Sequence, residues 1–248
     1  MVKFVNSRYG ETAMPDTSCE YVIIILYMPL FYQHNINQDT KLGIWFIEEP
    51  ESFFLQKVPM KRDVSHPFKR RQHLAGRYLL SFLFPDFPVE EIRIADTRQP
   101  FLVGDRYHFS ISHCGNYAAA IVSTNSRVGV DIELITQRIE RLAPKFLNED
   151  EEHFFNDDYA RFLEQWGLRG RVFQEFLTLI WNAKEAIFKW YGRGELDFKK
   201  HIKLEGNINL DGDWIKLPFV FNKGRSVHLT VEGRIFEEQS LTLAWLLT

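Results

Sequence analysis

The chain has 248 residues, and 45% of them are hydrophobic, which is enough to form the core of one large domain or two small ones. Its 30 Lys and Arg residues against 33 Asp and Glu give a formal net charge of -3. This balance argues against general nucleic-acid binding and leaves any anion site to a local group of cations. The two cysteines, Cys19 and Cys114, stand in unrelated contexts, so they offer neither a disulfide framework nor a metal-ligand spacing and fit the reducing cytoplasm.

The N-terminal region contains the longest apolar run, residues 21–31. A membrane-spanning helix needs roughly 20 apolar residues, and this run is shorter and contains Pro29, so we expect a buried strand and no membrane anchor. Residues 1–20 lack the basic start, apolar centre and cleavage site of a secretory signal. We expect Met28 to be an alternative translation start and residues 1–27 to be an extension, because the segment MPLFYQHN resembles the N-terminus of a protein.

The first half of the chain combines strands with one clear helix. Residues 43–47 (GIWFI) predict a strand, and the helical apolar stripe of residues 67–84 predicts a helix that stops before Pro85. Residues 107–112 and 117–123 flank a short HCGN turn and predict a β-hairpin.

The second half repeats this mixture. Asn148 and Glu151 have the spacing of a helix N-cap and its reciprocal partner, and residues 172–191 predict a longer helix that ends at Gly192. After Lys199 short alternating segments separated by Gly and Asp predict an antiparallel sheet. Helix and strands in both halves indicate an α+β protein.

A pair of acidic residues lies in the segment VGVDIE, which predicts a third strand. Alternation along a strand places Val128, Val130 and Ile132 on one face, so Asp131 and Glu133 share the other face with side chains about 7 Å apart. Mg²⁺ prefers oxygen ligands and fills its remaining positions with water and substrate phosphate, so this pair suits a diphosphate substrate. The alternative is a solvent-facing strand with two ordinary acids.

A third carboxylate lies in the helix segment WNAKEAIFKWYG. Trp181, Glu185 and Lys189 recur every four residues and therefore line one helix face. The alternative is a surface Glu–Lys pair worth about 0.2 to 0.5 kcal/mol, with Trp181 as a core anchor.

Two further groups could bind phosphate. Ser112 and His113 of FSISHC can donate hydrogen bonds to phosphate oxygens, although His113 could equally be a structural turn residue. Adjacent strand residues point to opposite faces, which argues against a nucleophile–base pair and against hydrolase chemistry. The other group is a basic cluster, for which the alternative is a solvated helix face: Lys61, Arg62, Lys69, Arg70, Arg71 and Arg77.

Taken together and in this order, FSISHC, GVDIE and WNAKEAIFKWYG resemble the three motifs of the 4'-phosphopantetheinyl transferase superfamily, particularly its longer Sfp-type members. The resemblance spans about residues 74–192. It implies a pseudo-duplicated α+β fold, with coenzyme A held in a cleft between two similar halves. We place these halves at residues 1–125 and 126–248, the second carrying the metal site.

The resemblance also implies roles for individual residues. Asp131, Glu133 and Glu185 match the family's magnesium ligands, and Lys189 matches the lysine near the diphosphate. The residues implied to contact coenzyme A phosphates are Ser112, His113, Lys189, Arg71 and Arg77. One departure stands out, because the family commonly has Gly-Lys-Pro where this chain has Arg98, Gln99 and Pro100.

The implied reaction moves the phosphopantetheine arm of coenzyme A to a serine of an apo acyl or peptidyl carrier protein, with release of adenosine 3',5'-bisphosphate. Glu185 and Lys189 are the implied catalytic residues. Two alternatives stay open: another magnesium enzyme that acts on a nucleotide diphosphate, and an inactive relative that only binds coenzyme A or a carrier protein.

Overall fold

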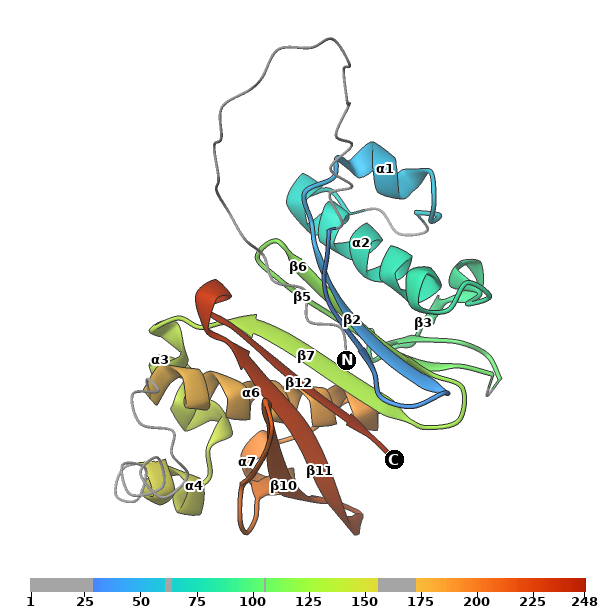
Figure 1. The fold of residues 1–248 in the computed structure, drawn as a ribbon. Helices are drawn as coiled ribbons and strands as arrows, with labels where there is room; N and C mark the ends of the chain where they lie inside the picture. The colour runs from blue at the N-terminus through green and yellow to red at the C-terminus, as the bar shows by residue number, and fades with distance from the viewer. Residues whose placement is uncertain (1–28, 61–63, 105, 156–172) are drawn as a thin grey trace, which may run out of the picture.

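The computed structural model describes residues 29–60, 64–104, 106–155 and 173–248. The expectations for residues 1–28, including the start at Met28, and the basic residues Lys61 and Arg62 lie outside the described residues. The architecture combines helices with antiparallel sheets, as the α+β prediction requires (Figure 1). No helix in the described part of the chain has the length and apolar character needed to cross a bilayer.

The first sheet has four antiparallel strands in the order β1-β2-β6-β5, and helix α2 covers its outer face (Figure 1). Leu74, Leu79 and Leu80 of α2 are buried against Ala120 and Val122 of the sheet. The elements up to residue 123 are β1 (Leu30–Asn35), β2 (Thr40–Phe46), α1 (Glu51–Leu55), α2 (Pro67–Leu83), β3 (Arg93–Ile94), β4 (Pro100–Phe101), β5 (His108–Cys114) and β6 (Tyr117–Ser123).

The second sheet follows the order β7-β12-β11-β10-β8, with β9 paired to β10, and helix α6 packs on it. Phe176, Leu179, Ile180 and Ile187 of α6 are fully buried in its core. The elements from residue 128 are β7 (Val128–Leu134), α3 (Arg138–Phe146), α4 (Glu149–His153), α6 (Phe173–Tyr191), α7 (Phe198–His201), β8 (Ile202–Leu204), β9 (Asn209–Asp211), β10 (Trp214–Lys223), β11 (Arg225–Phe236) and β12 (Leu241–Leu247).

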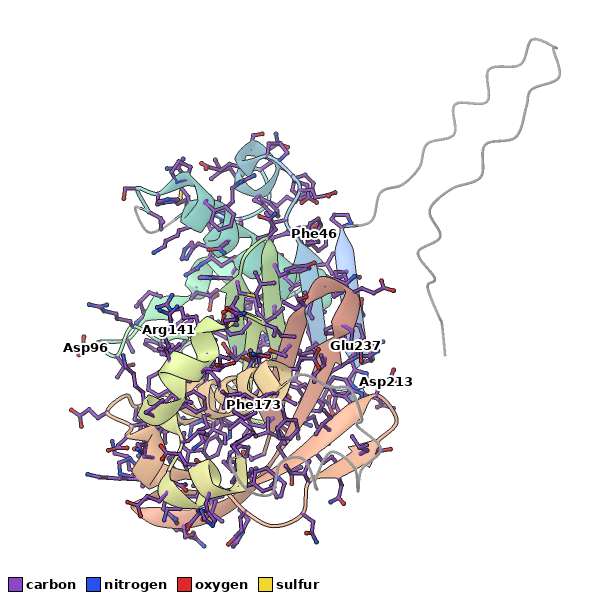
Figure 2. All side chains as sticks on the ribbon, turned by 90° about the vertical axis from the view of Figure 1, so that its left-hand side faces the viewer. Phe46, Asp96, Arg141, Phe173, Asp213 and Glu237 are labelled. Atoms are coloured by element: carbon purple, nitrogen blue, oxygen red, sulfur yellow. The ribbon has the colours of Figure 1, made fainter. Side chains whose placement is uncertain are left out.

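The two sheets face each other across a third apolar layer, so the order of layers is α2, first sheet, second sheet, α6 (Figure 1). Side chains fill these layers, whereas the turn at Asp96 between β3 and β4 projects at the edge of the molecule (Figure 2). Leu42, Ile44, Val130 and Ile132 all contribute to the layer between the sheets. Hydrophobic burial therefore joins the two sheets, and the predicted division near residue 125 would fall in the connection between β6 and β7.

Strand β7 has the predicted alternation of faces. Val130 and Ile132 enter the layer between the sheets, and the opposite face of the strand meets α6. A Cβ atom on Gly129 would lie 2.1 Å from the carbonyl oxygen of Ala186, so only a glycine allows this close approach. The approach brings the helix turn that contains Glu185 and Lys189 beside Asp131.

Most local predictions are confirmed. The predicted helix of residues 67–84 is α2, the hairpin is β5 and β6, and the expected capping pair forms, with Asn148 and Glu151 each accepting the other's backbone N–H. Two boundaries are wrong. Strand β5 continues through His113 and Cys114, which were assigned to the turn, because both residues pair with β6. Strand β2 begins at Thr40 and not at Gly43. The extra length follows from pairing with β6, where the hydroxyl groups of Thr40 and Ser123 lie 2.8 Å apart in a buried hydrogen bond.

Candidate active site

Asp131 is the centre of the candidate site. Its residue is 3% exposed on β7, and its Oδ1 atom accepts hydrogen bonds from the Ser112 hydroxyl at 2.7 Å and from the Lys189 ammonium at 2.6 Å. Its other oxygen, Oδ2, is buried without a hydrogen-bond partner. A buried carboxylate oxygen without a partner is costly, so Oδ2 is a position where a cation or a donor from a ligand would be favourable.

Glu133 and Glu185 are the other two acids of the predicted set. Burial, followed by the negative charge of Asp131, raises the pKa of each carboxyl to about 7. Lys189 lowers both pKa values, and a hydrogen bond from the Trp181 side chain also lowers that of Glu133. The negative charges of three carboxyl groups, two on β7 and one on α6, therefore repel one another. The positive charge of Lys189 partly offsets this repulsion.

This arrangement bears on whether a divalent cation fits. Among the described residues, no group of three or more His, Cys, Asp or Glu side chains is gathered closely enough to form a metal site. The donor chemistry nevertheless suits a hard cation, because it offers only carboxylate oxygens, two with raised pKa values and one without a partner. The assignment of Asp131, Glu133 and Glu185 as metal ligands stays a prediction.

Ser112 and His113 point in different directions, as strand alternation predicts. The Ser112 hydroxyl is buried and donates to Asp131, so it does not form a nucleophile–base pair with His113. His113 is an exposed residue, but desolvation of its ring lowers its pKa, and the charges of Lys189 and Lys69 lower it further. The neutral imidazole therefore lies within the field of two lysines at the rim of the site.

Arg71 and Arg77 of the basic cluster lie beside ring side chains of α2 itself. Arg71 lies 5.9 Å from the ring of Phe68, and Arg77 is buried with its Nη1 atom 3.0 Å from His73 Nδ1. The helix residue whose charge acts on His113 is Lys69, which was not among the expected coenzyme A contacts. Lys69, His73 and Arg77 recur every four residues along α2 and therefore share one helix face. This spacing is the sequence signal that could have identified them as one group.

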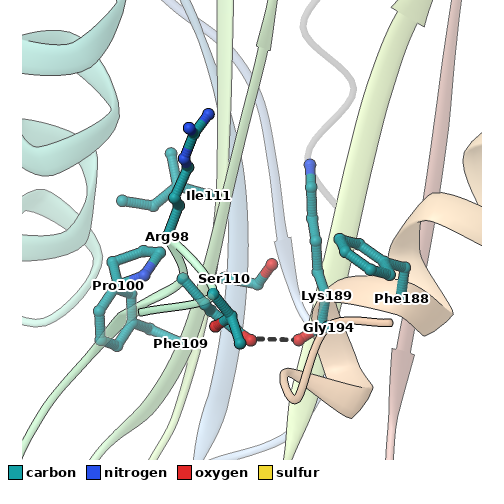
Figure 3. A pocket seen from close by; sticks show the side chains of 10 residues that line it. Arg98, Pro100, Phe109, Ser110, Ile111, Phe188, Lys189 and Gly194 are labelled. Atoms are coloured by element: carbon teal, nitrogen blue, oxygen red, sulfur yellow. Dashed lines mark hydrogen bonds between the residues drawn. The ribbon is translucent and has the colours of Figure 1, made fainter. Parts of the chain in front are cut away.

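A pocket of about 310 Å³ lies beside Lys189 between the β3–β4 turn, β5 and α6 (Figure 3). Its wall contains apolar groups from Pro100, Phe109, Ile111 and Phe188, and Arg98 and Lys189 contribute positive charge. Sequence reasoning missed the contact between Gln99 and α6, in which the Gln99 side-chain amide donates to the Lys189 carbonyl at 2.6 Å. The only sequence signal for this contact was that Gln99 stands where the family commonly has the lysine of Gly-Lys-Pro.

The raised pKa values predict how pH affects stability. Both carboxyls titrate near 4.5 in the unfolded chain and near 7 in the folded protein, so the folded protein binds more protons between these values. The free energy of unfolding should therefore fall as pH rises through this window, by up to about 1.4 kcal/mol per pH unit for each group before solvent screening. We expect urea midpoints of protein in chelator to fall between about pH 5 and pH 7.

A double variant, Glu133→Gln with Glu185→Gln, isolates this contribution from that of His113, whose lowered pKa acts in the opposite direction. The urea midpoint of the double variant should fall less steeply with rising pH than the urea midpoint of the wild type. Equal slopes for the two proteins would show that the carboxyl pKa values are not raised.

Comparison with known proteins supports the family suggested by the motifs. The profile of the 4'-phosphopantetheinyl transferase superfamily matches residues 127–243. Enterobactin synthase component D of Salmonella typhi is 36% identical over 124 residues, which make up 49% of this chain and 47% of that protein. Enterobactin synthase component D of Escherichia coli strain K12 is 31% identical over 153 residues, 58% of this chain and 68% of that protein.

The extent of these matches differs between relatives. This chain spans about half the length of the Salmonella proteins it matches and about two thirds of the Escherichia coli protein. The stretch matched by the family profile contains all three carboxylates of the candidate site and Lys189. The chain therefore belongs to the 4'-phosphopantetheinyl transferase superfamily.

Proposed function

We propose that this protein transfers the 4'-phosphopantetheine arm of coenzyme A to a serine of an apo acyl or peptidyl carrier protein, with Mg²⁺ and with release of adenosine 3',5'-bisphosphate. The observation that carries the proposal is the convergence on Asp131 of a serine from β5, a lysine from α6 and two further carboxyls. Membership of the superfamily supports the type of reaction, and these side chains are the groups that we expect to carry it out.

The metal would be held by Asp131, Glu133 and Glu185. When bound, Mg²⁺ supplies positive charge that neutralises the diphosphate and orients it for displacement. The unpartnered Oδ2 atom of Asp131 supports this assignment. Ser112 fixes the orientation of Asp131 through its hydrogen bond to Oδ1, which leaves the second oxygen available.

The nucleophile is the serine hydroxyl of the carrier, so the enzyme needs no activated serine or cysteine of its own. The serine oxygen forms a bond to the β-phosphorus of coenzyme A, and the bond from that phosphorus to the bridging oxygen breaks, which releases adenosine 3',5'-bisphosphate. Glu185, whose carboxyl lies among the acids of the site, accepts the serine proton. Lys189 stabilises the negative charge of the leaving phosphate.

The same proposal includes the arrangement of the substrates. Coenzyme A would bind between two similar halves, residues 1–125 and 126–248, with the pocket beside Lys189 as part of its site and with Ser112, His113, Arg71 and Arg77 as candidate phosphate contacts. Lys69 joins this set because its charge acts on His113. Carrier proteins are usually acidic, so we expect docking that weakens as salt rises, in the cytoplasm where such carriers work.

A mass assay tests the proposal. Purified protein is incubated with coenzyme A and a panel of apo carrier proteins, with Mg²⁺ and with a chelator, and the intact carriers are weighed. We expect at least one carrier to gain a phosphopantetheine group only when Mg²⁺ is present. Tight coenzyme A binding without any transfer would favour an inactive binding protein, and turnover of coenzyme A without a modified carrier would favour a different magnesium enzyme.

A further inference from the structure

Helix α6 packs across β7 and β12, and a polar contact lies inside this apolar interface (Figure 1). Asn182 of α6 and Thr242 of β12 are both completely buried. The Asn182 side-chain amide donates hydrogen bonds to the Thr242 carbonyl at 3.0 Å and to the Thr242 hydroxyl at 2.9 Å. The interface around them contains aliphatic side chains, among them Leu179, Ala186 and Ala244. A polar pair therefore lies where hydrophobic packing alone would favour two apolar residues.

This contact continues to Glu133, one of the three acids of the candidate site. Thr242 and Glu133 are direct partners in the antiparallel pairing of β12 with β7, and the Thr242 hydroxyl donates to the Glu133 carbonyl at 3.3 Å. The hydroxyl thus accepts from Asn182 and donates to the backbone of Glu133. The Glu133 side chain is also hydrogen-bonded by Trp181, the residue before Asn182. Two neighbouring positions of α6 therefore hold the backbone and the side chain of the same acid.

The contact has a cost, because Asn182 Oδ1 is buried without a hydrogen-bond partner. A leucine, whose shape is similar to that of asparagine, would avoid this cost. The Thr242 carbonyl can only accept a hydrogen bond, so it determines which end of the amide faces β12. A buried polar group that is retained at a cost in stability is known chiefly as a device that fixes the register of packed helices.

The position of α6 decides whether its functional side chains reach β7. Glu185 follows Asn182 by three residues and Lys189 follows it by seven, so the three residues lie toward one side of the helix. The negative charges of Asp131 and Glu133 repel the carboxylate of Glu185. Hydrophobic contacts are non-directional and resist a rotation of α6 weakly, whereas hydrogen bonds depend on angle. The Asn182 contact therefore opposes a movement that would turn Glu185 away from β7.

We propose that Asn182 is a positioning residue, which fixes the rotation and axial position of α6 through Thr242 and so keeps the cation site preformed. The inference rests on the proposed function, because it takes Asp131, Glu133 and Glu185 as the ligands of the cation. Without the contact, α6 would also occupy positions in which Glu185 faces away from β7. A cation binds only the competent position, so its apparent affinity falls with the fraction of molecules in that position. Saturating cation restores the competent position.

The test measures cation binding and stability of the full chain, with a double variant that combines Asn182→Leu and Thr242→Val. This variant replaces the polar pair by apolar side chains of similar shape, so its urea midpoint in chelator should equal or exceed that of the wild type. Mn²⁺ is the probe, because carboxylate oxygens bind it as they bind Mg²⁺. The affinity for Mn²⁺, measured by electron paramagnetic resonance without substrates, should fall about tenfold. The Mg²⁺ concentration that half-saturates transfer should rise by the same factor, with a rate at saturating Mg²⁺ within about threefold of the wild type.

Two single variants accompany the double variant. Thr178→Val is the matched control, because the buried Thr178 hydroxyl donates to the Gln174 carbonyl of the same helix. It should keep the wild-type affinity for Mn²⁺. Thr242→Val alone leaves the bond from Asn182 to the carbonyl of residue 242, so it should weaken Mn²⁺ binding by only about threefold. This milder change tests the same contact in a protein that keeps half of it.

The outcomes separate this inference from the proposed function. A folded double variant with the Mn²⁺ affinity of the wild type would overturn the positioning role of Asn182, and so would a variant that loses stability but not affinity. A wild type that does not bind Mn²⁺ would overturn the inference together with the assigned metal ligands. A wild type that binds Mn²⁺ more tightly than the double variant but transfers no phosphopantetheine would support the inference and overturn the proposed function.

Discussion

Glu185→Gln should lose phosphopantetheine transfer by roughly 10³-fold or more while the protein stays folded. The amide cannot accept the serine proton, and it replaces a carboxylate that we assign to the metal. Burial, followed by the negative charge of Asp131, raises the pKa of Glu185 to about 7, which is the property expected of a functional acid or base. A neutral glutamine also removes repulsion between the carboxylates, so stability at neutral pH should be unchanged or higher.

The measurement is the initial rate of carrier modification, followed by intact mass at saturating coenzyme A and Mg²⁺. Glu205→Gln is the matched control, since it makes the same chemical change at an exposed glutamate that pairs with His228 of β11, outside the candidate site. That control should keep the wild-type rate, and both variants should show the wild-type circular dichroism spectrum. A Glu185→Gln protein within a factor of about three of the wild type would eliminate Glu185 as the base.

Glu151→Ala should destabilise the protein by about 3 to 5 kcal/mol, the largest stability effect that we expect from a single change. Its carboxylate accepts a 2.6 Å hydrogen bond from the ammonium of Lys184, which is completely buried. The same ammonium donates to the Phe146 carbonyl at 2.7 Å and to the Ile202 carbonyl at 2.9 Å. Without Glu151, a buried positive charge would lose its counterion, and the N–H of Leu204 would lose its acceptor.

Urea unfolding followed by tryptophan fluorescence measures this effect. The double variant Lys184→Met with Glu151→Leu is the informative comparison, because replacing both charges by apolar groups is far less harmful than removing one. We expect it to recover much of the stability lost in Glu151→Ala. Wild-type stability in Glu151→Ala would mean that water reaches Lys184 and that the ion pair is not buried.

Lys184 and Glu185 show what a sequence can predict and what it cannot. They are adjacent in one motif, but they leave α6 on different sides: Lys184 enters the core and bonds to residues of α3, α4 and the start of β8, whereas Glu185 joins the acids of β7. The fourfold spacing predicted the shared face of Trp181, Glu185 and Lys189 because that spacing is a local property of helices. The burial of Lys184 depends on partners 18 to 38 residues away, which no local pattern specifies.

The same distinction explains the other results. The hairpin and the long helices followed from periodicity and turn residues, which act over a few positions. The extension of β2 to Thr40 and the contact of Gln99 with α6 depend on partners 83 and 90 residues away. A core anchor was one alternative for Trp181, and the residue does pack on Phe146 with ring centroids 5.1 Å apart, but its side chain also hydrogen-bonds Glu133. That second contact depends on how β7 and α6 are placed relative to each other, which no local pattern specifies.

The bond between Lys189 and Asp131 has a consequence for ligand selection. In the free protein this lysine already has a negatively charged partner at 2.6 Å, so an incoming anion competes with a carboxylate for the same ammonium. A monovalent ion such as chloride or acetate would exchange one single charge for another and gain little. A ligand that carries several charges on neighbouring oxygens can offset the lost bond between Lys189 and Asp131. The free protein should therefore bind small monovalent anions weakly and bind polyphosphates more tightly.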